Sequence, residues 1–211
     1  MTYRLVVVIA AGALLVAGCS TADDPDDDSP TPVPEGETTA LDDTMLLVAT
    51  EMPAWNNAGT WVATDDAGFL RVCPLTDPES LGATDTQGVT YKYVVELDEG
   101  DAADSEAEPM LGGNILASFS DEATAASAVE AWRAELAACS EDGELTQLDG
   151  GATWTGSDLD EATELAWFDF TGVAAKGAST TIVGFSLQGQ DANVESDPLA
   201  APMQTSIDRL P

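Results

Sequence analysis

The first 40 residues differ sharply from the rest of the chain, and they leave only residues 41–211 to build a folded core. An unbroken apolar run, Leu5–Val16, follows Arg4 and precedes a stretch made almost entirely of Ser, Thr, Pro, Asp and Glu. At about 12 residues, the run is too short to span a bilayer core, which needs roughly 20. A charged start followed by an apolar run of this length is typical of a signal peptide, which we expect over residues 1–18.

The apolar run ends in two small residues and a cysteine, Ala17-Gly18-Cys19. This order resembles the lipobox of bacterial lipoproteins, in which the cysteine thiol receives a diacylglyceryl group and the peptide bond before it is cleaved. The alternative is an ordinary signal peptide that a cysteine happens to follow. Each buried CH₂ of an acyl chain such as palmitate contributes about 0.8 kcal/mol, so two or three chains would anchor the protein stably. We therefore expect Cys19 to be lipidated and to hold the protein on the extracytoplasmic face of a cell membrane.

The stretch that follows Cys19 is expected to be a disordered tether. Five aspartates repel one another between Asp23 and Asp28, and four prolines stiffen the backbone between Pro25 and Pro34. Residues 20–40 contain hardly any apolar side chain whose burial could offset the entropy lost on ordering. We interpret residues 19–40 as a lipidated linker that holds the folded domain away from the bilayer.

Composition excludes several classes of function. Acidic residues outnumber basic ones by 39 to 6, and a net charge of −33 repels nucleic acids and anionic lipid head groups. Histidine is absent, which removes Ser-His-Asp and Cys-His catalysis and imidazole zinc sites. The acidic segment Asp98–Glu108 lacks the Asp-x-Asp-x-Asp-Gly order of a calcium loop, so we interpret it as a solvated loop. We expect no nucleic-acid partner, no catalytic residues, no cofactor and no metal.

The two remaining cysteines form an even pair in an oxidising compartment. We predict a disulfide between Cys73 and Cys139, and the alternative is two free buried thiols. The bond would close a loop of about 66 residues, which stabilises a protein by roughly 4 kcal/mol on the chain-entropy model.

The pattern of apolar residues predicts a mixed structure. A long helix is predicted over Asp121–Cys139, with Ser120 as its N-cap, and a shorter one from about Ala201 to Leu210. The long helix has one apolar stripe, formed by Ala125, Val129, Trp132, Leu136 and Cys139. Runs rich in β-branched and aromatic residues predict strands at Thr60–Ala63, Gly68–Cys73, Val89–Leu97, Asn114–Phe119, Ala166–Thr171 and Thr180–Gly189.

Several short motifs occur in a recognisable order. Met45–Pro53 precedes Trp61 and Cys73, and Phe119–Ala123 opens a helix that ends in Leu136–Cys139. Together, over about residues 44–210, they resemble the PknH-like extracellular sensor domains of actinobacteria, which occur on serine/threonine kinases and as free lipoproteins. The resemblance implies a strongly bent sheet, a cleft, disulfides and a ligand. With the predicted elements, it points to a single α+β domain, residues 41–211. Its mainly antiparallel sheet would be packed by one long helix and a C-terminal helix.

Aromatic residues in or beside strands and loops are candidate ligand contacts, because aromatics around a concave site suit an apolar or sugar-bearing envelope molecule. These candidates are Trp55, Trp61, Tyr91, Tyr93 and Trp154. The alternative is that they belong to the hydrophobic core, since Trp and Tyr bury large areas.

The export signal, the tether and the missing catalytic groups favour a non-catalytic ligand-binding or sensing domain, whose ligand would be a small molecule or an envelope component. The alternative is a structural or scaffolding lipoprotein whose acidic face docks a basic protein partner. A deep aromatic-lined cavity would favour the first, and a flat acidic face the second. A hydrolase based on two close carboxylates is a third class.

Overall fold

A computed structural model describes residues 40–53, 59–65, 68–70, 72–95, 110–139, 143–160, 165–189 and 198–211. The expected signal peptide, Cys19, all but the last residue of the tether, Trp55 and Asp98–Glu108 lie outside these ranges. None of the helices in the described ranges has the length and apolar character needed to cross a membrane.

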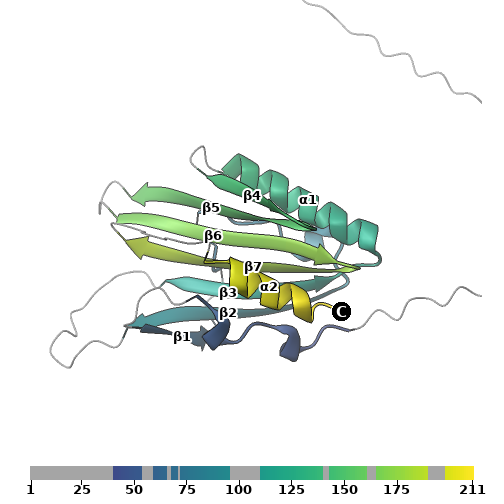
Figure 1. Cartoon of the computed structure of the whole chain (residues 1–211), viewed down its shortest axis with the longest axis horizontal. Coiled ribbons are helices and arrows are strands. Elements are labelled where there is room, and N and C mark those ends of the chain that lie inside the picture. The colour runs from purple at the N-terminus through teal and green to yellow at the C-terminus, as the bar shows by residue number, and fades with distance from the viewer. Residues whose placement is uncertain are drawn as a thin grey trace, which may run out of the picture. The chain divides into compact units, whose positions relative to one another are not determined.

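The described residues form an α+β domain on one open, seven-stranded antiparallel sheet (Figure 1). The strand order is β1-β2-β3-β7-β6-β5-β4. The strands are β1 (Gly59–Thr64), β2 (Asp85–Val95), β3 (Leu111–Ser118), β4 (Glu144–Leu148), β5 (Gly151–Asp160), β6 (Leu165–Lys176) and β7 (Ser179–Gly189). Because β7 pairs with both β3 and β6, the last strand joins the two halves of the sheet. The predicted α+β class and its antiparallel sheet are confirmed.

Helices cover both faces of the sheet. The long helix α1 (Glu122–Cys139) packs against β4 to β7, and we call this side the α1 face. On the opposite side, the α2 face, the helix α2 (Ala200–Arg209) lies over β6 and β7 (Figure 1). Three short 3₁₀ helices, η1 (Asp43–Met45), η2 (Ala49–Glu51) and η3 (Pro78–Leu81), lie in the segments before β1 and before β2.

The core has a layer on each face, because successive side chains of a strand point to opposite sides. On β7, Ile182 packs in one apolar cluster with Trp132 of α1, whereas its neighbour Val183 packs in another with Leu47 and Met203. Every residue of β7 from 179 to 187 is buried. This two-sided burial explains why the strand appears in the sequence as a continuous β-rich run without polar alternation.

Five of the six predicted strands overlap β1, β2, β3, β6 and β7, but the predicted strand Gly68–Cys73 is wrong. Its described residues form a loop, because the backbone N–H groups of Val72 and Cys73 bond to the Asp169 carboxylate instead of to a neighbouring strand. The sequence prediction also missed β4 and β5. Their Gly, Asp and Glu residues disfavour a strand locally, and antiparallel pairing of β5 with β6 and of β4 with β5 overrides that preference.

The long helix begins one residue later than predicted, and its N-cap is Asp121 rather than Ser120. An Asp121 carboxylate oxygen accepts the Thr124 backbone N–H at 2.8 Å, while the Ser120 hydroxyl donates to the same carboxylate. Hydrogen bonds from the Thr124 backbone, and then from the Thr124 and Ser120 hydroxyls, lower the pKa of Asp121. The carboxylate satisfies a backbone donor that the first helical turn leaves unpaired, which explains the shift of the cap.

Candidate functional site

The α1 face carries a cavity of about 630 Å³, which we call the groove. It lies between strands β2, β3 and β7 and the segment before β2, which is described over residues 68–70 and 72–82, includes η3 and is called the loop below. Its floor is apolar and includes Phe69, Leu70, Ile115 and Ile182. Hydroxyl groups of threonine and serine also line it, and the loop contributes two carboxylates. A volume of this size is in the range of small-molecule sites.

The loop approaches the sheet closely because two strand positions beneath it have no side chain. A Cβ at Gly113 of β3 would lie 2.7 Å from the Phe69 ring, and a Cβ at Gly184 of β7 would lie 2.5 Å from Leu70 Cδ2. The side chains of Phe69 and Leu70 therefore occupy the space above these two glycines. A larger residue at either position would push the loop away from the sheet and change the floor of the groove.

One side of α1 fixes the loop through three residues spaced i, i+3 and i+7, which share a helix face. The Trp132 indole N–H donates to the Thr76 carbonyl oxygen at 2.8 Å. The Glu135 carboxylate accepts the Thr76 backbone N–H at 2.9 Å and the Thr76 hydroxyl at 2.6 Å. Cys139 is bonded to Cys73, with 5.8 Å between their Cα atoms, a usual separation for a disulfide. The predicted cysteine pair thus joins the loop to α1.

A buried carboxylate fastens the loop from below. Asp169 on β6 is 0% exposed, and its Oδ2 accepts the backbone N–H groups of Val72 at 2.6 Å and Cys73 at 3.1 Å. Its Oδ1 bonds to the Ser186 hydroxyl, which also lies 2.9 Å from the Phe69 carbonyl oxygen. Burying a carboxylate is costly without such donors, so the loop and the carboxylate depend on each other.

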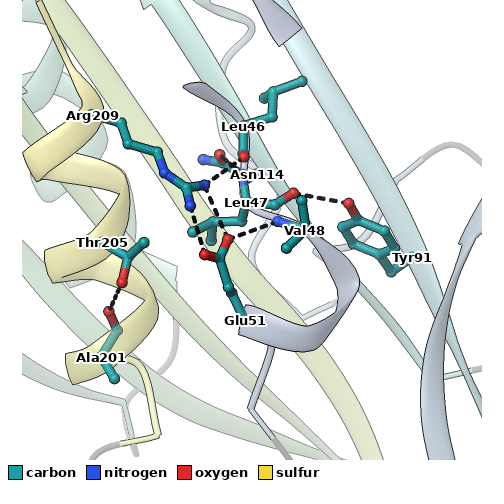
Figure 2. A network of polar contacts seen from close by, with 9 residues as sticks. All are labelled: Leu46, Leu47, Val48, Glu51, Tyr91, Asn114, Ala201, Thr205 and Arg209. Carbon is teal, nitrogen blue, oxygen red and sulfur yellow. Dashed lines mark hydrogen bonds and ion pairs between the residues drawn. The ribbon is translucent and has the colours of Figure 1, made fainter. Parts of the chain in front are cut away.

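A polar network around Asn114, which is fully buried, joins the segments that pack on the α2 face (Figure 2). Its side-chain oxygen accepts the Leu47 backbone N–H at 3.1 Å, and the Tyr91 hydroxyl donates to the Leu47 carbonyl oxygen at 2.8 Å. The Asn114 amide nitrogen reaches the hydroxyls of Thr181 at 2.9 Å and Ser206 at 3.2 Å. One asparagine thus connects the segment before β1 to β7 and α2.

The same network contains an ion pair between α2 and η2 (Figure 2). The Arg209 guanidinium donates to both carboxylate oxygens of Glu51, at 2.6 Å and 3.0 Å, and to the Leu46 carbonyl oxygen at 2.7 Å. Burial acts to raise the pKa of Glu51, but the hydrogen bonds from Arg209 and Val48 and the charge of Arg209 outweigh it and lower the pKa. Burial, and secondly the charge of Glu51, raise the pKa of Tyr91.

The lowered pKa of Glu51 predicts a specific pH dependence. Its folded-state pKa lies below the unfolded value of about 4.3, so the ion pair contributes stability above that pH and loses it as the pH falls through the folded value. At neutral pH, Glu51→Gln should be less stable than the wild type by about 1 kcal/mol. Urea denaturation at a series of pH values should show this difference shrink as the pH falls below about 4.3. A constant difference would contradict the prediction.

The four aromatic candidates that the structure describes do not line the groove. Trp61, Tyr91 and Tyr93 lie on the α2 face, each 6–7% exposed, and the rings of Trp61 and Tyr93 meet edge-to-face at 5.2 Å between centroids. Trp154 lies on the α1 face, 1% exposed, in the cluster with Trp132. The structure therefore brings three of them together on the face opposite the groove, packed as core residues.

Sequence reasoning did not find the residues that shape the groove. Asp169 interrupts the apolar run Trp167-Phe168-Asp169-Phe170, and a lone acid in a buried strand indicates a carboxylate with hydrogen-bond partners. Glu135 stands between Trp132 and Cys139 at helical spacing, so it could have been placed on the same side of α1. Phe69 and Leu70 gave no comparable signal, because their positions depend on the distant glycines.

The described residues contain no group of three or more His, Cys, Asp or Glu side chains placed to hold a metal ion. The resemblance to PknH-like sensor domains stays a prediction from the sequence motifs. No protein-family model, curated protein or solved structure matches the chain.

Proposed function

We propose that this protein is a lipid-anchored lipoprotein of the extracytoplasmic membrane face whose domain binds a ligand in the groove without catalysis. The observation that carries the proposal is the groove itself, a cavity of about 630 Å³ with an apolar floor and polar groups around it. Mostly apolar pockets of this size with a few polar groups are the usual form of small-molecule sites. The Leu5–Val16 run and Cys19 support export and anchoring, and the absence of histidine from the chain supports a non-catalytic role.

The groove is also held in place before any ligand arrives. Its loop is joined to α1 by the Cys73–Cys139 disulfide and by the hydrogen bonds that Trp132 and Glu135 make to Thr76. The conformational entropy of the loop is therefore lost on folding rather than on binding, which favours ligand affinity. A pre-organised loop beside an apolar floor is expected of a ligand-binding site, and a surface that served only for solubility would not need it.

A groove-filling substitution at Gly88 tests the proposal. Gly88 on β2 lines the groove, and an added Cβ would meet Ile115 Cγ1 at 3.7 Å and the Asn114 carbonyl oxygen at 3.8 Å, which are ordinary contacts. Gly88→Phe should therefore fold and occupy the groove. Native mass spectrometry of the wild type extracted from its own membrane should show a bound small molecule, and Gly88→Phe should reduce its occupancy about tenfold, the equivalent of 1.4 kcal/mol.

The matched control for this experiment is Thr155→Phe. Thr155 is exposed on β5, outside the lining of the groove, so it adds the same side chain to another strand. The control should keep the adduct at the wild-type level. A wild type without adduct, or equal loss in both variants, would refute binding in the groove.

The anchor is tested separately by Cys19→Ser. This substitution removes the only thiol at the expected cleavage site, so the protein should remain unprocessed or leave the membrane fraction. Mass spectrometry of the N-terminal peptide and fractionation of cells measure the outcome. Normal processing and membrane retention of the variant would refute the lipoprotein assignment.

A further inference from the structure

The lining of the groove separates into an apolar floor and a polar, acidic rim. Phe69 and Ile182 on the floor are buried, whereas Leu70 and Ile115 are only partly buried and leave apolar surface for a ligand to cover. The loop side carries the exposed residues Asp77, Glu79 and Ser80. The strand side adds the hydroxyls of Thr86 and Thr90 from β2. A ligand that fits both parts has an apolar portion and a polar head group.

The charge of the rim restricts that head group. Both ionisable residues among the described lining are acids, Asp77 and Glu79. The half-buried Lys92 lies two residues beyond Thr90 on β2 and is not part of the lining. An anionic head group placed here would face two like charges with no positive partner in the described lining, whereas hydroxyls and carboxylates accept hydrogen bonds from neutral or cationic groups. Like-charge contact discriminates strongly against the wrong ligand.

We infer that the groove takes an amphiphile whose head group carries no negative charge. The apolar chain or ring covers the floor formed by Leu70 and Ile115, and a hydroxylated or cationic head group contacts the rim at Asp77 and Glu79. This inference rests on the proposed function and names the chemical class of its ligand.

Three probes with the same tail and different head groups test the inference: decyl maltoside, decyltrimethylammonium and decyl sulfate, each below its micellar concentration. The protein is a chain that starts at residue 19 and carries Cys19→Ser, because it keeps every described residue and cannot be acylated. Calorimetric titration should detect binding of the neutral and cationic probes, and decyl sulfate should bind at least about tenfold more weakly. Gly88→Phe should weaken the neutral and cationic probes by a similar factor.

Two double variants separate the rim from the overall charge of the chain. Asp77→Asn/Glu79→Gln should raise the affinity for decyl sulfate about tenfold and change that for decyl maltoside little. Glu144→Gln/Asp149→Asn removes the same two charges from exposed positions on β4 and the turn after it, outside the groove. That variant should leave the discrimination between the probes unchanged.

The possible results separate an error in the ligand class from an error in the binding site. If decyl sulfate binds as tightly as decyl maltoside and Gly88→Phe blocks both, the ligand class is wrong, while binding in the groove stands. If the control double variant restores decyl sulfate as well as the rim variant does, the rim does not select the head group, and the inference is overturned. If no probe binds, or Gly88→Phe blocks none, the proposed function falls together with the inference.

Discussion

Replacing Cys73 and Cys139 together by serine should lower the free energy of unfolding by about 4 kcal/mol. The bond joins residues separated by 66 positions, and without it the unfolded chain regains the freedom of a long loop. For a domain of this size each kcal/mol shifts the melting temperature by about 2–4 °C, so a fall of roughly 10 °C is expected. Thermal and urea denaturation of both proteins measure the effect, and an unchanged midpoint would contradict it.

The same substitution should weaken binding in the groove beyond its effect on stability. The disulfide joins the last residue of α1 to the loop, and without it the loop still has the hydrogen bonds of Trp132 and Glu135 to Thr76. Leu187→Ala is a suitable control, because Leu187 is buried on the α2 face and its truncation costs about 2–5 kcal/mol. The control should lose stability but keep its ligand. Equal loss of ligand in both variants would show that stability alone decides binding.

Asp169→Ala should be the most disruptive single substitution beneath the loop, with a loss of about 3 kcal/mol or more. It removes the acceptor of the Val72 and Cys73 backbone N–H groups, and each buried donor left without a partner costs about 1–3 kcal/mol. Ser186→Ala removes one hydroxyl and should cost only about 1 kcal/mol. Urea denaturation of both variants tests this order.

A surface aspartate provides the control for Asp169. Asp208 is exposed on α2, and its replacement by alanine should change stability by no more than about 0.5 kcal/mol. If Asp169→Ala were as mild as Asp208→Ala, the carboxylate would not hold the loop, and the explanation for the missing strand at Gly68–Cys73 would be wrong. A large loss for Asp169 with a small loss for Ser186 would support the carboxylate as the main fastening point.

Local periodicity was sufficient to predict the two α-helices α1 and α2. Ala125, Val129, Trp132 and Leu136 recur at helical spacing, and all four are buried on α1. The same reasoning placed α2 within one residue of its observed bounds, with Met203 buried against the sheet. These predictions succeeded because the hydrogen bonds of a helix and its buried stripe both depend on residues three or four positions apart.

Strands were harder to predict, because their hydrogen bonds are made to distant segments. β4 and β5 have weak strand propensity and become strands through pairing, β5 with β6 and β4 with β5. The segment Gly68–Cys73 is the opposite case, because its local strand propensity is not realised in the structure. It looks like a strand locally, but Asp169 lies 96 and 97 positions away from the two residues whose N–H groups it binds. A single buried acceptor there outweighs the local preference.

The sequence by itself determined the properties that do not depend on the fold: the acidic charge, the lack of histidine, the apolar run before Cys19 and the two remaining cysteines. Tertiary structure alone decided the position of the groove. Phe69 and Leu70, in the loop, form part of its floor because Gly113 and Gly184, on two strands distant in the sequence, leave room for them. The aromatic candidates Trp61 and Tyr93 lie on the opposite face. Successive side chains of a strand point to opposite sides, and only strand pairing and packing decide which face of the sheet each side chain occupies.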